Sequence, residues 1–171
     1  MHLSGSWRWG LMKITNEEFS QRFAGRIRVS FNWPQFRIQN WPVEKISIDG
    51  RRICPALRLP WYVGVNGMVS FDEPGASPVR LSEVDRWYSM LPEQQRTDID
   101  NMRVEYLRRS RSLEPEIPVY ALQNGEYLVM DGNHRLSALA LSALSFSVDM
   151  WVVHGPIAAS ALGDLKYFSP I

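Results

Sequence analysis

The stretch Tyr127-Leu-Val-Met-Asp-Gly-Asn-His-Arg-Leu-Ser-Ala-Leu-Ala140 joins a strand pattern to a helix pattern and decides the fold of this chain. Residues 127–130 have the apolar character of a buried strand, and Gly132 permits a sharp turn. We predict a strand, a turn and a helix, with Asn133 as the helix N-cap. The apolar residues beyond the turn recur with the i, i+3, i+4, i+7, i+8 spacing of a helix face: Leu136, Leu139, Ala140, Ala143 and Leu144.

The charges in this stretch suggest a ligand. His134 and Arg135 fall in the first turn of the predicted helix. A helix N-terminus carries about half a positive charge, so a cation there is unfavourable by about 0.3–1 kcal/mol unless an anion is close. A phosphate held by backbone N–H groups and a forked guanidinium would supply that anion. The alternative is that Arg135 forms a structural ion pair with Asp131 or Glu126.

The neighbouring segments predict a mixed α/β (α+β) sheet. Residues 117–122 have a strand pattern, and Asn124-Gly125 turns the chain back into 127–130. A further strand is predicted at 146–153. The strand before the turn therefore has partners close to it in sequence.

The order of strand, Asp-Gly-Asn-His-Arg box, helix and strand over residues 80–154 resembles the ParB/sulfiredoxin superfamily. In that superfamily a Gly-x-His-Arg or Gly-Glu-Arg-Arg box at this turn binds nucleotide phosphates. The resemblance implies a ParB/sulfiredoxin-like small mixed sheet with flanking helices. It also implies that ATP or CTP is bound by Gly132, Asn133, His134 and Arg135.

The candidate catalytic residues are Asp131 and His134. Alternation along a strand places Glu126 and Asp131 on opposite faces, which makes Asp131 the better candidate for activating water or a metal. Its alternative role is a cap or an ion-pair partner of Arg135. Mg²⁺ bound by carboxylates and nucleotide phosphates is the one metal that these residue types favour.

The chain also departs from the superfamily. Sulfiredoxins carry their catalytic cysteine inside the box, where this chain has Asn133, and the single cysteine, Cys54, is predicted to be a small buried side chain. Sulfinic acid reduction is therefore not expected. Chromosome-partition ParB proteins continue into a helix-turn-helix region, whereas this chain stops 17 residues after His154. We expect a free-standing member of the superfamily.

Three functions stay open. The first is a nucleotide phosphohydrolase acting on ATP or CTP, with the DNase activity attributed to some members. The second is a nucleotide-gated module that binds a protein partner, like plasmid-borne factors that inhibit conjugative or oncogenic DNA transfer. The third is a small-molecule kinase, which needs a catalytic carboxylate that the sequence does not place.

Residues 1–78 are predicted to form an N-terminal β-hairpin-rich extension on a core at 79–171, with the break at Asp72–Pro78. The capping-box spacing of Thr15 and Glu18 predicts a helix to about Ala24. A strand is predicted at 26–31, and hairpins are predicted around Asp49-Gly50 and Asn66-Gly67. Further helices are predicted at 82–90 and from Pro92, the second with a buried face of Ile99, Met102, Tyr106 and Leu107.

Charge and composition limit the kinds of partner that the protein is expected to bind. Residues 1–80 hold 11 Lys/Arg against 6 Asp/Glu, and residues 81–171 hold 8 against 12. Sequence-independent contact with DNA is one interpretation of the densest basic spots, and an ordinary solvated surface is the other. One cysteine and the lack of a long apolar run suggest a cytoplasmic protein without a transmembrane segment. The candidate DNA-binding residues are Arg51, Arg52, Arg108 and Arg109.

Overall fold

The strand that precedes Gly132 lies inside a mixed sheet, with hydrogen-bonded neighbours on both sides. The computed structural model describes residues 11–27, 30–109 and 113–168. The strands described are β1 (Met12–Ile14), β2 (Val43–Asp49), β3 (Leu57–Gly64), β4 (Gly67–Val69), β5 (Ser77–Arg80), β6 (Glu116–Ala121), β7 (Tyr127–Val129) and β8 (Ser147–Val153). The α-helices are α1 (Asn16–Phe23), α2 (Trp33–Ile38), α3 (Gly50–Ile53), α4 (Val84–Trp87), α5 (Glu93–Arg108) and α6 (Asn133–Leu141). The 3-10 helices are η1 (Cys54–Ala56), η2 (Leu81–Glu83), η3 (Tyr88–Met90), η4 (Gln123–Gly125) and η5 (Gly163–Tyr167).

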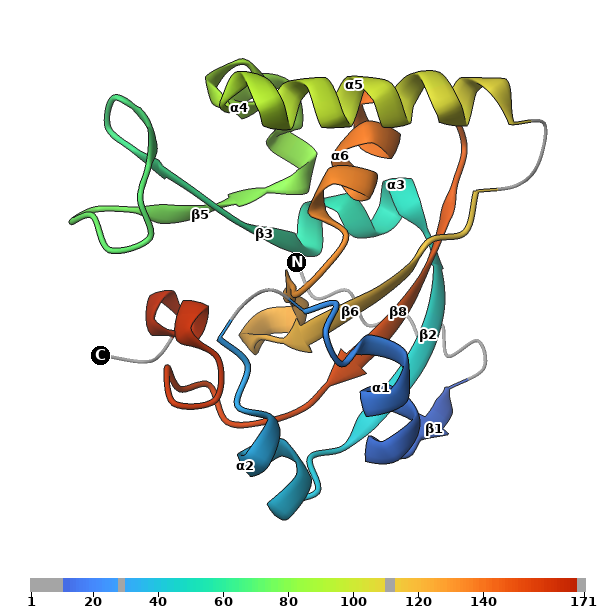
Figure 1. Cartoon of the computed structure of the whole chain (residues 1–171), viewed down its shortest axis with the longest axis vertical. Helices are drawn as coiled ribbons and strands as arrows, with labels where there is room; N and C mark the ends of the chain where they lie inside the picture. Colours follow the sequence, from blue (N-terminus) through green and yellow to red (C-terminus); the bar gives the residue numbers. More distant parts are fainter. Residues whose placement is uncertain (1–10, 28–29, 110–112, 169–171) are drawn as a thin grey trace.

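The sheet has the order β1-β2-β8-β6-β7-β3-β4, with β5 paired to β3 (Figure 1). Pairing is parallel between β6 and β8 and between β3 and β7, and it is antiparallel elsewhere. The predicted α/β class with a mixed sheet and flanking helices is confirmed. Both predicted parts, 1–78 and 79–171, contribute to this one sheet, because β2 pairs with β8 and β3 pairs with β7.

Each face of the sheet has its own core. On one face, β-strand side chains such as Val119 and Val129 pack with α4, α5 and α6. On the other face, Tyr120 and Leu128 pack with α1, α2 and the segment that leads into η5. Helix α6 is buried on several sides, since Leu136, Ala138 and Leu139 are all fully buried. The helix that begins at the box is therefore fixed against both α5 and the sheet.

Several local predictions are confirmed. The capping box of α1 is present, with reciprocal bonds between Thr15 and Glu18. The predicted hairpin joins β3 to β4, although its two loop residues are Val65 and Asn66, one position before the predicted turn, and Gly67 is the first residue of β4. Asn124, with φ at 62°, turns β6 back into β7. Pro92 precedes α5 as predicted.

The hairpin predicted at Asp49-Gly50 is wrong. The Asp49 side chain accepts a hydrogen bond from Arg52 N at 3.0 Å and caps α3, so the chain enters a helix. Gly50 packs directly under the Phe146 ring, where a Cβ would lie 2.1 Å from the nearest ring carbon. Strand β2 instead pairs along its whole length with β8.

Three further predictions need correction. Within the described part of 26–31 no strand forms, and Phe31 makes only a single bridge to Leu162; residues 28–29 lie outside the described residues. Helix α6 ends at Leu141, before the last two residues of the predicted apolar face, because Ser142 has extended backbone angles. Leu107 is 62% exposed, since the buried side of α5 runs through Ile99 and lies away from it.

Candidate functional site

The turn into α6 is built on Gly132, which adopts a left-handed conformation with φ at 93°. The backbone angle favours glycine, and a Cβ at this position would also lie 2.9 Å from Ile117 Cδ1 and 3.0 Å from Arg135 Nη2, so that these side-chain ends would have to move. Gly132 is therefore the N-cap of α6, and the prediction that Asn133 takes this place is wrong. Asn133 is the first residue of the helix.

The N-terminus of α6 borders a hollow. The N-cap residue, Gly132, has no side chain with which to cap this end of the helix, and the first N–H groups of a helix have no acceptor within it. The hollow has a volume of about 400 Å³, within the range of small-molecule sites. The predicted residues Asp131, Gly132, Asn133, His134 and Arg135 all line it, together with Pro60, Met102 and Met130.

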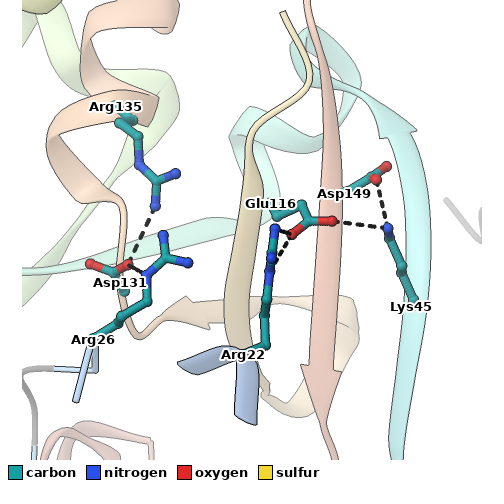
Figure 2. Close-up of polar contacts among 7 residues, drawn as sticks. All are labelled: Arg22, Arg26, Lys45, Glu116, Asp131, Arg135 and Asp149. Carbon is teal, nitrogen blue, oxygen red and sulfur yellow. Dashed lines mark hydrogen bonds and ion pairs between the residues drawn. The ribbon is translucent and has the colours of Figure 1, made fainter. Parts of the chain in front are cut away.

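The Asp131 carboxylate lies between two arginines (Figure 2). Arg135 Nη2 donates to Asp131 Oδ2 at 3.3 Å, which is the ion pair that the structural alternative expects. Arg26 Nε lies 4.0 Å from the same oxygen. Because the three side chains remain 24–44% exposed, these ion pairs contribute little to stability.

Arg26 was not found by sequence reasoning. It follows α1, and its backbone N–H donates to the carbonyl of Phe23, a buried residue that fixes the turn. The neighbours of Arg26 in the sequence do not indicate a ligand site, because Arg26 approaches the box only in the folded structure. Two guanidinium groups thus share one carboxylate at the positive end of α6, which leaves a local excess of positive charge.

A second ion-pair group on the sheet gives the contrast (Figure 2). There Glu116 contacts both Arg22 and Lys45, and Lys45 Nζ also lies 2.9 Å from Asp149 Oδ2. The hydrogen bond to Asp149 raises the pKa of Lys45. Two cations meet two carboxylates in this group, so it has no excess charge for an anion to neutralise.

Glu126 lies away from Arg135. Its carboxylate contacts Arg58 at 3.1 Å and Arg80 at 2.6 Å, and so links the start of β3 to the end of β5. Of the two ion-pair partners predicted for Arg135, Asp131 and Glu126, the one that it contacts is Asp131.

A Mg²⁺ ion bound by a carboxylate and by nucleotide phosphates stays a prediction, because such an ion needs only one or two protein carboxylates. Among the described residues, no three His, Cys, Asp or Glu side chains gather as a metal-binding group. Asp131 Oδ2 already faces two guanidinium groups, which would repel a further cation. Cys54 is buried, as predicted, and burial raises the pKa of its thiol to about 11.

The predicted DNA-binding arginines have differing surroundings. Arg51 donates to the carbonyls of Ala140 and Leu144 at 3.1 and 3.2 Å, and also to that of Ser142, so it caps the C-terminal end of α6. Arg109 pairs with Glu105 one turn earlier. Arg52 and Arg108 have exposed side chains.

Comparisons of the chain with protein-family models, with curated proteins and with solved structures found no match in any of the three. In the part of the chain that the structure describes, no helix has the length and apolar character needed to cross a membrane.

Proposed function

We propose that the protein binds the phosphates of ATP or CTP at the N-terminus of α6 and hydrolyses the nucleotide. The observation that carries the proposal is the N-terminus of α6, where Gly132 is the N-cap and a hollow of about 400 Å³ lies beside two guanidinium groups that share one carboxylate. The Gly-Asn-His-Arg box resembles that of the ParB/sulfiredoxin superfamily, which supports a nucleotide as the ligand. We also propose, on the same resemblance, that the fold is ParB/sulfiredoxin-like.

The binding contacts follow from the chemistry of this end of the helix. The backbone N–H groups of Asn133, His134 and Arg135 would donate to phosphate oxygens, as at other helix N-termini. The Arg135 guanidinium has five donors, of which one contacts Asp131, so the fork can still hold two phosphate oxygens. Arg26 would supply a second positive charge from outside the box.

Hydrolysis additionally needs a group that accepts a proton from the attacking water. Asp131 and His134 both line the hollow and are the candidates. Asp131 has one carboxylate oxygen held by arginine, which leaves Oδ1 for water. The His134 ring lies 5.3 Å from the Trp61 ring in an edge-on arrangement, and this contact orients the imidazole.

A nucleotide-gated protein-binding module is the second candidate. The observation that favours it is the pairing of Asp131 with two arginines, because a carboxylate in that position serves structure as well as it serves catalysis. Binding without turnover would require only the helix end and Arg135.

Titration calorimetry and release of labelled phosphate from ATP and CTP test the proposal. A hydrolase should bind one of them and release phosphate, while Asp131→Ala or His134→Ala should retain binding and lose release by at least tenfold. Glu73→Ala, in the exposed loop between β4 and β5, is the control and should behave as wild type. Binding without release would establish the second candidate, and a wild-type protein that binds neither nucleotide would contradict both.

A further inference from the structure

A second hollow adjoins the first. It has a volume of about 490 Å³, and both Met102 and Arg135 line the two hollows in common. Its other walls come from α5, from α6 and from the segment at 113–115. A ligand held at the end of α6 can therefore extend past Arg135 along the groove between α5 and α6.

The residues that line this second hollow differ in character from those that line the hollow at the N-terminus of α6. Tyr106, Leu113 and Leu139 give it apolar walls, and the Tyr106 ring is half-buried beside them. The Arg109 guanidinium lies 5.7 Å from the centre of that ring and pairs with Glu105 at the rim. Apolar walls with a few charged groups at the edge suit a planar ring that carries polar substituents.

We propose that the hollow between α5 and α6 is the nucleoside subsite, in which the base packs against Tyr106 while Arg135 holds the phosphates. The inference rests on the proposed function. It also fits the spacing, since Leu139 lies about 9 Å along the helix from Asn133 at 1.5 Å per residue. A nucleotide spans such a distance between its phosphates and its base.

Inorganic tripolyphosphate separates the two parts of the site, because it has the phosphates of a nucleoside triphosphate and no base. We would measure its affinity by calorimetry beside that of ATP and CTP. Tyr106→Ala should weaken binding of the preferred nucleotide roughly tenfold, as expected for loss of one base–aromatic contact, and leave tripolyphosphate binding unchanged. Tyr106→Phe should restore the nucleotide affinity.

The neighbouring Leu107→Ala is the matched control, because Leu107 is 62% exposed on the same helix. It should bind both compounds as wild type does. Arg135→Ala should abolish the binding of both compounds, since it acts on the phosphates. This pattern would place the base and the phosphates in adjoining subsites.

The failures of the two proposals are distinguishable. If Arg135→Ala weakens both compounds and Tyr106→Ala weakens neither, or weakens both equally, the phosphate site stands and the nucleoside subsite is wrong. If wild type binds neither tripolyphosphate nor nucleotide, the proposed function itself fails. Photolabelling of wild type with an azido-base analogue of the preferred nucleotide gives a test without substitutions. Label in the peptides at 102–109 or 113–115 is expected, and label confined to other peptides would overturn the inference.

Discussion

Arg26 Nε lies 4.0 Å from Asp131 Oδ2, and that oxygen also accepts a hydrogen bond from Arg135. The contact brings the turn after α1 against the turn before α6, although the two are far apart in the sequence (Figure 2). It has an electrostatic consequence: one carboxylate faces two guanidinium groups beside the positive end of a helix. A bound phosphate would neutralise the remaining charge.

Arg26→Ala should therefore weaken binding of ATP or CTP by roughly tenfold, because it removes one unit of charge next to the phosphates. Stability should change by less than about 1 kcal/mol, since Arg26 is 44% exposed and its ion pair is long. Calorimetry and thermal melting measure the two effects.

Arg37→Ala is the matched control for this substitution. Arg37 lies 5.7 Å over the Trp33 ring, just as Arg26 lies 5.7 Å over the Phe23 ring, but it is on α2 and does not contact the box. Unchanged affinity in Arg26→Ala, or an equal loss in Arg37→Ala, would remove Arg26 from the site.

Arg135→Ala should abolish nucleotide binding and leave the free protein about as stable as wild type. The substitution removes a cation from the first turn of α6, which favours the helix by up to about 1 kcal/mol. It does not strand Asp131, because that side chain is 24% exposed and Arg26 remains near it. Melting without ligand and nucleotide titration are the measurements.

Arg135→Lys refines this test. It keeps the charge and loses the planar fork, so we expect affinity between those of wild type and Arg135→Ala. A purely structural Arg135 predicts the opposite result. In that case Arg135→Ala would lose more than about 1 kcal/mol of stability and would bind nucleotide normally.

The parts of the structure that were predicted correctly are those encoded by neighbouring residues. The Thr15–Glu18 capping box, the β3–β4 hairpin and the strand-turn-helix of the box each depend on contacts within a few positions. In such patterns the residue types themselves determine the local backbone geometry. Gly132 is an example, since its left-handed angle explains both the sharpness of the turn and the identity of the residue.

The parts that were missed depend on contacts between distant segments. Asp49-Gly50 has a hairpin sequence, yet the Phe146 ring packs on Gly50 and the chain enters α3. Arg51 belongs to a basic pair, yet its guanidinium caps the C-terminal end of α6. Arg26 reaches Asp131 only because α1 packs on the sheet. No local pattern contains these partners.

The surroundings of the basic residues decide how DNA binding is best tested. Arg51→Glu would place a carboxylate against the carbonyls at the C-terminal end of α6, so it should destabilise the protein by about 1 kcal/mol or more. Any loss of DNA binding in that variant would be ambiguous. Arg52→Glu and the double variant Arg108→Glu/Arg109→Glu change exposed side chains that do not hold the C-terminal end of α6, and they are the better probes.

If the protein binds DNA, wild type should bind labelled duplexes of unrelated sequence with similar affinity, and the affinity should fall steeply between about 50 and 200 mM salt. The Arg108→Glu/Arg109→Glu variant should bind more weakly and show a shallower salt dependence, because fewer counterions are released. Fluorescence anisotropy measures both. Binding that is equal at low and high salt would count against a DNA surface.

The last prediction concerns Asp164, which is 5% exposed and accepts a hydrogen bond from the Tyr62 hydroxyl. Burial raises the pKa of this carboxyl above its ordinary value of 3.8. The folded protein therefore holds the proton more tightly than the unfolded chain. The resulting stabilisation is complete below pH 3.8 and is lost as the pH rises through the raised pKa.

Asp164→Asn should remove this dependence, because an amide does not titrate and its oxygen can still accept from Tyr62. We expect the variant to melt a few degrees above wild type at pH values above the raised pKa of Asp164, and the difference should shrink as the pH falls through that pKa toward 4. Asp72→Asn is the control, since Asp72 is 85% exposed, and it should show no such gain. Melting curves from pH 4 to 8 provide the measurement. A gain for Asp164→Asn that stays constant over this range would show that the carboxyl does not titrate there and that burial is not the cause.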